Sequence, residues 1–223
     1  MRSLVIVPAY NEQALVGQVV AEIRRHGLSV VVVDDGSTDA TAARALAAGA
    51  TVLRHCVNRG QGAALQTGIT FAIAQQVDAL VTFDADGQQD AEQIQAVLEP
   101  IESGRAEVAL GSRFLDIDPS LPNTRRVVLR FAAAITRWYT GLRVTDVHNG
   151  FRAFSRSAAE RLCIHQDRMA HASELLEQIA AGKFRYVEVP VRVRYTHYSL
   201  GKGQKLRHSV QIVWDLFFSR LSK

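Results

Sequence analysis

The chain has few of the features that mark secreted or membrane-spanning proteins. Its two cysteines, Cys56 and Cys163, lie far apart and lack metal-ligand spacing, which favours buried free thiols in a reducing compartment over a disulfide. No uninterrupted apolar run approaches the roughly 20 residues that cross a bilayer. The stretch before Pro8 lacks the apolar region and cleavage site of a signal peptide. We therefore expect a cytoplasmic protein, with residues 1–223 forming one domain.

Two further absences weigh against other classes of nucleotide-handling protein. The chain lacks the aromatic platform motifs of RNA-binding modules, so we expect no nucleic-acid partner. The loop Pro8–Glu12 holds neither glycine nor arginine, unlike the loop expected of a sugar nucleotidyltransferase. A non-catalytic nucleotide binder is a third alternative, and the presence of Asp84, Asp86 and Gln88 argues against such an inactive site.

Charge is divided unevenly along the chain, although its net charge is only +4. Residues 1–112 carry 7 Lys and Arg against 13 Asp and Glu, whereas residues 113–223 carry 19 against 9. An acidic first half suits a metal ion. A basic second half suits an anionic partner, such as phosphates or an anionic membrane surface.

Short apolar runs alternate with helical patterns through the first half. The runs that predict buried strands are Leu4–Val7, Val30–Val33, Thr51–Leu53, Ala79–Phe83 and Val108–Leu110. Helical patterns follow them, beginning near Glu12 in the first case and spanning about 91–102 before the last strand. This alternation predicts an α/β fold with a doubly wound, mainly parallel sheet flanked by helices.

The second half is less regular. We expect a helix over 124–142, a helix over 172–181 that carries Glu174, and an edge strand over 186–193 because Pro190 interrupts it. An amphipathic C-terminal helix is predicted over 206–221, and it either packs on the domain or contacts a membrane surface.

Polar residues follow three of the predicted strands. They are Tyr10 with Glu12, Asp34 with Asp35, and Asp84 with Asp86. The carboxyl ends of parallel strands meet at one edge of a sheet, where α/β proteins bind their ligands. Asp84 and Asp86 are one residue apart on a strand end, so we expect their carboxylates on one side, with a hard divalent cation between them.

Six motifs give the chain a family resemblance. They are PAYNE (8–12), VDDGSTD (33–39), NRGQGAA (58–64), DADGQ (84–88), GSRF (111–114) and NGFRAF (149–154). With these motifs in this order, the chain resembles the inverting family-2 glycosyltransferases of GT-A fold. Among them it is most similar to the polyprenyl-phosphate sugar transferases typified by dolichol-phosphate mannose synthase.

The resemblance assigns roles to particular residues. Residues 1–112 become the half that binds the nucleotide sugar, and residues 113–223 the half that binds the acceptor. The nucleotide-sugar contacts implied are Pro8, Tyr10, Glu12, Val33, Asp35, Asp84, Ala85, Asp86, Arg194 and Lys202. The metal ligands implied are Asp84, Asp86 and Gln88, holding Mg²⁺ or Mn²⁺. The acceptor-phosphate contacts implied are Arg113, Arg125 and Arg130, and the catalytic residues are Asp86, Arg113, Arg125 and Glu174.

The chain departs from the family pattern at two places. The separation of Arg194 from Lys202 is longer than usual, and Leu129 stands where relatives carry a hydroxyl-bearing residue. The resemblance implies transfer of a sugar from a UDP- or GDP-sugar to a polyprenyl phosphate, peripherally at the cytoplasmic membrane face or with a membrane partner protein. The alternative is a related transferase acting on a glycan or glycolipid hydroxyl, for which Glu174 is the candidate base; otherwise Glu174 orients an arginine or a loop.

Overall fold

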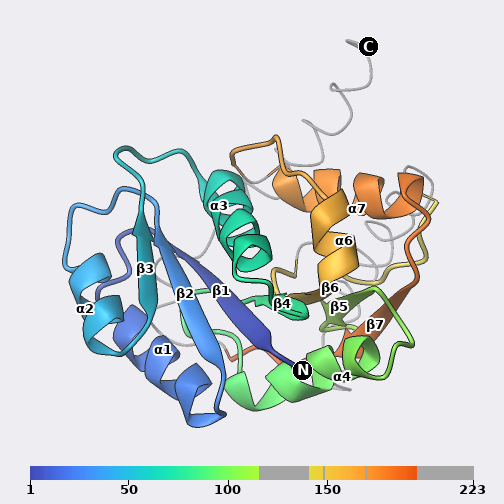
Figure 1. Cartoon of the computed structure of the whole chain (residues 1–223), viewed down its shortest axis with the longest axis horizontal. Helices are drawn as coiled ribbons and strands as arrows, with labels where there is room; N and C mark the ends of the chain where they lie inside the picture. The colour runs from blue at the N-terminus through green and yellow to red at the C-terminus, as the bar shows by residue number, and fades with distance from the viewer. Residues whose placement is uncertain (116–140, 148, 169, 195–223) are drawn as a thin grey trace, which may run out of the picture.

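The computed structural model describes residues 1–115, 141–147, 149–168 and 170–194 (Figure 1). Its strands are β1 (Ser3–Ala9), β2 (Ser29–Asp34), β3 (Thr51–Arg54), β4 (Ala79–Thr82), β5 (Val108–Ser112), β6 (Arg152–Ser155) and β7 (Tyr186–Pro190). Its helices are α1 (Val16–Arg25), α2 (Thr41–Ala47), α3 (Gln61–Ala74), the 3-10 turn η1 (Ala91–Gln93), α4 (Ile94–Glu102), α6 (Arg156–Arg161) and α7 (His171–Ala181).

The described strands form one sheet in the order β3-β2-β1-β4-β6-β5-β7. Strand β6 is antiparallel to both of its neighbours, β4 and β5, and the other described pairs are parallel. The expectation of a doubly wound, mainly parallel sheet is therefore confirmed. The last strand of the order is β7, so the expected edge position of the Pro190 strand is confirmed within the described residues.

Helices cover both faces of the sheet because its strands are apolar on both sides (Figure 1). On one face, side chains of α1, α2 and α4 pack against residues such as Val5 and Val7 of β1. On the other face, side chains of α3, α6 and α7 pack against Leu4 and Ile6 of the same strand. The alternation along β1 is the period-two pattern of a strand buried from both sides.

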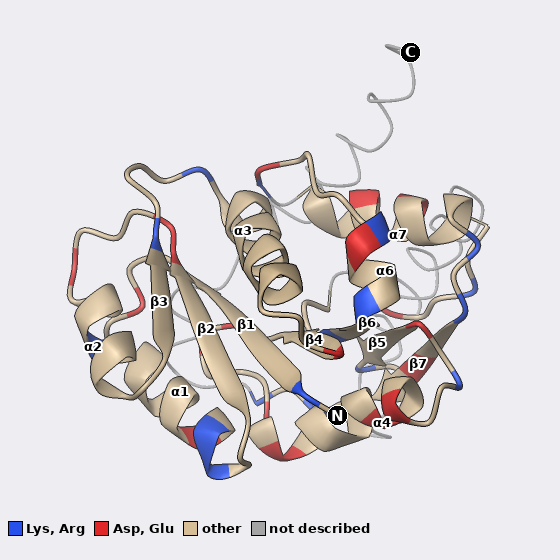
Figure 2. Cartoon of the chain, viewed as in Figure 1, with Lys and Arg blue, Asp and Glu red and all other residues tan. Residues whose placement is uncertain are grey.

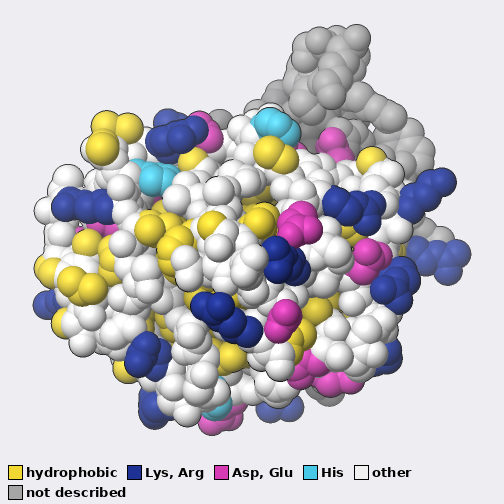
Figure 3. Space-filling view, viewed as in Figure 1, with side chains coloured by type: hydrophobic (Ala, Val, Ile, Leu, Met, Phe, Trp, Pro, Cys, Tyr) yellow, Lys and Arg dark blue, Asp and Glu magenta, His cyan; other side chains and the backbone are white. Residues whose placement is uncertain are grey.

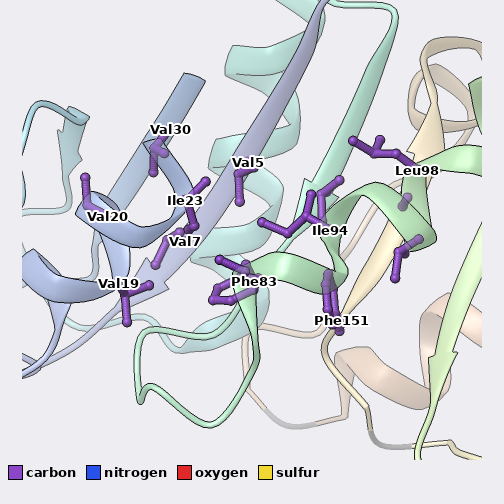
Figure 4. Close-up of a cluster of buried hydrophobic side chains, with 14 of the residues drawn as sticks. Val5, Val7, Val19, Val20, Ile23, Val30, Phe83, Ile94, Leu98 and Phe151 are labelled. Carbon is purple, nitrogen blue, oxygen red and sulfur yellow. The ribbon is translucent and has the colours of Figure 1, made fainter. Parts of the chain in front are cut away.

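The first of these clusters contains Phe83 and Ala85, the two residues that flank Asp84 in the chain. In Figure 4, Phe83 and Phe151 lie near Ile94 of α4, and Leu98, farther along the same helix, belongs to the same cluster. The two rings are edge to face, with centroids 5.3 Å apart. This pair packs the end of β4 against the turn before β6. The DADGQ and NGFRAF motifs are therefore held together by an aromatic contact.

Three local expectations need correction or fall outside the described chain. Helix α1 begins at Val16, not near Glu12, because the Glu12 carbonyl accepts bonds from residues 15 and 16 in a preceding turn. Cys56 and Cys163 are free as expected, but they are exposed, so the expectation of burial is wrong. The predicted helices at 124–142 and 206–221 lie wholly or almost wholly outside the described residues.

Candidate active site

The carboxyl edge of the sheet collects the polar loops. The parallel strands β1, β2 and β4 all end at this edge, and antiparallel β6 begins there, with Arg152 paired to Thr82. Figure 2 shows the acidic end of β2 beside the basic end of β3. There the Asp34 carboxylate lies 3.2 Å from Nε of Arg54. The expected convergence of strand ends is therefore present.

The loop after β1 is fastened to the loop after β2. The Asn11 amide donates to Oγ of Ser37 at 2.9 Å, and the Glu12 amide donates to Oγ1 of Thr41 at 2.8 Å. The side chain of Asn11 in turn accepts from the Thr38 amide at 3.0 Å. These bonds fix the PAYNE and VDDGSTD motifs relative to each other and leave the Tyr10 ring 45% exposed at the site edge.

Asp35 holds the loop that leads into α3. Its Oδ2 accepts from the Gly60 amide at 2.6 Å, and its Oδ1 accepts from the Arg59 amide at 3.0 Å. Oδ1 also lies 2.7 Å from Nδ1 of His55. The neighbouring Gly36 has φ +74°, and a Cβ on it would meet the backbone of 57–58 at 2.8 Å. Only glycine allows this close approach. The loop after β2 therefore packs directly on the loop before α3, and Asp35, a predicted nucleotide contact in the first loop, accepts hydrogen bonds from the second.

Asp84 is clamped by two glutamine amides. Its Oδ2 accepts from Nε2 of Gln89 at 2.6 Å, and its own amide donates to Oε1 of Gln89 at 3.1 Å. Its Oδ1 accepts from Nε2 of Gln61 at 3.1 Å. A Cβ on Gly150 would lie 2.8 Å from Oδ2, so the backbone of the NGFRAF motif presses directly against this carboxylate.

Burial shifts the protonation of Asp84. Removal from water, and next the charge of Asp86, raise the pKa of Asp84 from 3.8 to about 7; the charges of Arg152 and Arg113 and the bond from Gln61 oppose this rise. The negative charge of Asp86 thus acts on Asp84 across the turn after β4. A site that holds two repelling carboxylates beside each other has the chemistry of a divalent cation site.

Asp86 and Gln88 lie in the turn after β4. The Gln88 amide donates to Oδ1 of Asp86 at 3.0 Å, and the Gln88 carbonyl accepts from the Arg194 amide at 2.7 Å. The Arg194 side chain donates to Oδ2 of Asp90 at 2.7 Å. Among the described residues, no group of three or more His, Cys, Asp or Glu side chains could hold a metal. The residues fit a cation whose remaining ligands come from phosphate oxygens and water.

Arg152 is buried between the two halves of the site. Its Nε donates to the carbonyl of Asn149 at 3.0 Å, and its NH2 group donates to the carbonyl of Val147 at 3.1 Å. Burial lowers its pKa to about 10, against the charges of Asp146 and Asp84, which raise it. Arg152 thus remains a cation at neutral pH, and its side chain donates to backbone carbonyls within the turn before β6.

Arg113 is paired with a carboxylate that the sequence did not single out. Its Nε lies 2.6 Å from Oδ2 of Asp146 and its NH2 group 2.8 Å from Oδ1. The Asp146 side chain is 2% exposed and that of Arg113 is 31% exposed. The expected acceptor residue is therefore held in place at the surface by a buried anion.

Glu174 lies in the first turn of α7, where its carboxylate accepts four bonds from a neighbouring loop. The donors are the amide and Nδ1 of His165 and the amide of Gln166, at 2.9 to 3.1 Å. This is the loop-orienting alternative of the two considered for Glu174. Its role as a base stays a prediction.

The remaining predicted residues divide into buried and undescribed ones. Val33 and Ala85 are buried, one in each of the two core clusters, so a nucleotide would meet their backbone rather than their side chains. Pro8 pairs with Val33 in the sheet. Arg125, Arg130, Lys202 and Leu129 lie outside the described residues.

Sequence reasoning missed the partners of the predicted residues. Gln61, Gln89, Gly150 and Asp146 each bind or abut a predicted residue. Gln61 and Gly150 stood inside quoted motifs and Gln89 directly follows one, which was a usable signal. Asp146 lies in a stretch with no motif, and only the fold brings it to Arg113.

Two further properties concern the charge distribution on the surface and the length of the apolar helices. On the face shown in Figure 3, basic and acidic side chains are interspersed, and several Lys and Arg side chains line the edge beside β7. Searched over the described residues, no helix combines the length and apolar character required for membrane crossing.

Comparison with known proteins identifies relatives over nearly the whole chain. The family model described as Glycosyl transferase family 2 matches residues 4–163. A UDP-N-acetylglucosamine–dolichyl-phosphate N-acetylglucosaminyltransferase of Methanococcus voltae is 31% identical, covering 98% of this chain and 96% of the relative. A polyprenol monophosphomannose synthase of Mycolicibacterium smegmatis is 30% identical, covering 94% and 84%.

A solved structure shares the fold. It is glucosyl-3-phosphoglycerate synthase from Mycobacterium tuberculosis, with Mg²⁺ and uridine diphosphate, at a TM-score of 0.74 and 22% identity; the match covers 99% of this chain and 78% of that one. The GT-A architecture expected from the motifs is therefore confirmed as a fold.

Proposed function

Because the chain belongs to glycosyl transferase family 2, we propose that it transfers a sugar from a nucleoside-diphosphate sugar to a polyprenyl phosphate, with inversion. The donor is a UDP- or GDP-sugar bound along residues 1–112, and the acceptor binds residues 113–223. Both named relatives in the comparison carry a polyprenyl-type acceptor in their names, dolichyl phosphate in one case and polyprenol in the other.

One observation carries this proposal. Asp84 and Asp86 lie at the carboxyl end of β4, close enough for the charge of Asp86 to raise the pKa of Asp84. The loops that end β1 and β2 meet at the same edge. A diphosphate with a divalent cation supplies the positive charge and the oxygen ligands that suit this pair.

Asp86, with Asp84 and Gln88, would hold Mg²⁺ or Mn²⁺. When bound, such an ion stabilises the negative charge that grows on a departing diphosphate. The chain's own part is to fix the donor. Gln61 and Gln89 hold the Asp84 carboxylate in one orientation, and the bond to Asp90 holds the Arg194 side chain at the loop after β4. Arg194 and Lys202 are proposed to bind the diphosphate.

An anionic acceptor explains the basic side of the site. A phosphate monoester is already a nucleophile at neutral pH and needs little help from a base, but it needs cations to bind beside a departing diphosphate. Arg113, placed by Asp146, is the described cation on this side. Arg125 and Arg130 are proposed to join it. The acceptor's lipid tail implies a peripheral position at the cytoplasmic membrane face, or a membrane partner protein.

A hydroxyl acceptor is the second candidate. It would require a carboxylate base, and Glu174 is the predicted one. The donors from His165 and Gln166 occupy both oxygens of the Glu174 carboxylate, so these oxygens are engaged by the neighbouring loop. This arrangement favours the phosphate acceptor.

The test is a transfer assay with matched acceptors. The full chain is incubated with radiolabelled UDP- and GDP-sugars, Mn²⁺ or Mg²⁺, and either undecaprenyl phosphate or undecaprenol in detergent. We expect product only from the phosphate, and none when the metal is removed with a chelator. Transfer to undecaprenol alone would refute the proposal and favour the second candidate.

A further inference from the structure

The Arg113–Asp146 pair is more than a surface ion pair. Two donors of one guanidinium edge bind the two oxygens of one carboxylate, at 2.6 and 2.8 Å, and the Arg113 amide adds a third bond to Oδ2 at 3.1 Å. A guanidinium has five N–H donors in a rigid plane, so fixing one edge also fixes the direction of the other. Pairs of this two-point kind determine geometry as well as energy.

The backbone at Asp146 is positioned by bonds that do not involve Arg113. Its amide donates to Oε1 of Glu188 on β7 at 3.3 Å. The preceding Thr145 donates to the same oxygen through its amide at 2.7 Å and its hydroxyl at 2.9 Å. The Thr145 hydroxyl also lies 2.6 Å from Oγ of Ser112, the last residue of β5. The carboxylate therefore has a position set by two strands.

The same segment reaches the donor side of the site. Gly150, four residues after Asp146, presses on the Asp84 carboxylate, and β6 begins at Arg152. Arg152 donates to two carbonyls inside this turn, and Thr82 donates to the Gly150 carbonyl at 2.6 Å. The buried Arg152 charge acts on both Asp146 and Asp84. Residues 145–147 and 149–152 thus connect the Arg113 contact to the Asp84 contact, and we call these residues the bracket.

We propose that Asp146 is a positioning residue for the acceptor: through the bracket (145–147 and 149–152) it sets the direction of Arg113 and its separation from Asp84. The anion recognised is a phosphate monoester attached to an isoprenoid chain. This inference rests on the proposed function and deepens it, because it names the group that places the acceptor-binding cation. Arg152 fixes the bracket and does not touch substrate.

The test is a double-mutant cycle read by binding rather than by turnover. Geranyl phosphate, a short soluble isoprenyl phosphate, is titrated calorimetrically into the full chain in the presence of UDP and Mn²⁺, with geraniol as the uncharged control. The variants are Asp146→Asn, Arg113→Ala and both together. Glu160→Gln, which breaks the exposed Arg156–Glu160 pair on α6, is the matched carboxylate control.

We expect Asp146→Asn to weaken geranyl phosphate binding by roughly tenfold, the loss typical of a hydrogen bond to a charged group. The affinity for UDP with Mn²⁺ should stay within about twofold, since the nucleotide is bound by other loops. Arg113→Ala should weaken binding of the phosphate, and adding Asp146→Asn to it should cause little further loss. Glu160→Gln should match the unmodified chain.

Two outcomes would overturn the inference. Equal geranyl phosphate affinity in Asp146→Asn and the unmodified chain would show that Asp146 positions nothing. Additive losses in the double variant would show that Asp146 acts apart from Arg113. If Asp146→Asn does not fold, Glu188→Ala, which removes the acceptor of the Thr145 and Asp146 amides and leaves the ion pair in place, takes its role in the cycle. Absence of geranyl phosphate binding by the unmodified chain refutes the proposed acceptor instead.

Discussion

Gly150 faces the carboxylate of Asp84 so closely that a Cβ on Gly150 would lie 2.8 Å from Oδ2 and 2.9 Å from Oδ1. Asp84 cannot retreat, because Gln61 and Gln89 hold its two oxygens. A glycine at this position is thus part of the geometry of the acidic pair. It lies far from β4 in sequence and reaches the site through the antiparallel pairing of β6.

The first prediction concerns this contact. Gly150→Ala should push the Asp84 carboxylate away from its two amide donors and weaken Mn²⁺-dependent UDP binding by about 10- to 100-fold, the range seen when groups that orient metal ligands are changed. The measurement is a calorimetric titration of UDP with Mn²⁺. Gly17→Ala on α1 is the control, because its Cβ would meet only ordinary contacts beyond 3.5 Å. Unchanged UDP affinity in Gly150→Ala would contradict the role of this contact.

The second prediction concerns pH. Burial and the charge of Asp86 raise the pKa of Asp84 from 3.8 to about 7 in the folded chain. The folded state therefore binds this proton more tightly than the unfolded chain does. The stability that the Asp84 proton contributes is fully present below the unfolded pKa of 3.8. It is lost as the pH rises from there through the folded pKa of about 7, at about 1.4 kcal/mol per pKa unit.

The experiment follows from this sign. The melting temperature of the unmodified chain minus that of Asp84→Asn should fall as the pH rises from about 4 to about 7. Below and above this range the difference should be constant. The asparagine does not titrate, so ionisable groups that do not interact with Asp84 cancel in the difference. A difference that stays constant over this range would mean that Asp84 titrates normally.

The third prediction separates the acidic pair from ordinary surface acids. Asp86→Asn should lower Mn²⁺-dependent UDP affinity by more than about a hundredfold, because it removes a proposed metal ligand rather than a group behind one. Asp78→Asn is the matched control, since Asp78 is an exposed aspartate just before β4, at the opposite edge of the sheet. Both variants are compared by thermal shift with UDP, with and without Mn²⁺. Equal shifts in the two variants would place the metal elsewhere.

The fourth prediction concerns Glu174. Its carboxylate holds the loop at His165 and Gln166, so Glu174→Gln should lower the melting temperature and leave the pH dependence of transfer unchanged. Glu177→Gln, about one turn further along α7, is the control. If Glu174 is instead a base, Glu174→Gln should abolish the acidic limb of the rate profile and spare the fold.

The short apolar runs, and the polar residues that follow them, were enough to predict the sheet and the acidic residues at its carboxyl edge. Runs such as Val30–Val33 have a length and composition that leave little choice, and parallel strands must end together. The start of α1 was missed because Glu12 is drawn into a turn bonded to Thr41, a contact between two loops. Sequence periodicity carries no record of such a contact.

The partners of the site were missed for a related reason. Asp146 meets Arg113 across 33 positions and Gln61 meets Asp84 across 23. Each is an unremarkable residue in its own neighbourhood. The choice of partner is made by the order of strands, in which β6 is inserted between β4 and β5, and no local pattern predicts that insertion.

The reversed direction of β6 also determines where the chain tolerates change in length. One residue added between Asn149 and Arg152 would turn Arg152 to the opposite face of the sheet and lift Gly150 from Asp84. The turns at Gln75–Gln76 and Gly104–Arg105 lie at the amino edge, where the strands begin. Tags, linkers or an inserted domain placed there would leave the carboxyl edge, with its proposed site, intact, so the amino edge is the natural point for attaching a membrane anchor or a fluorescent reporter.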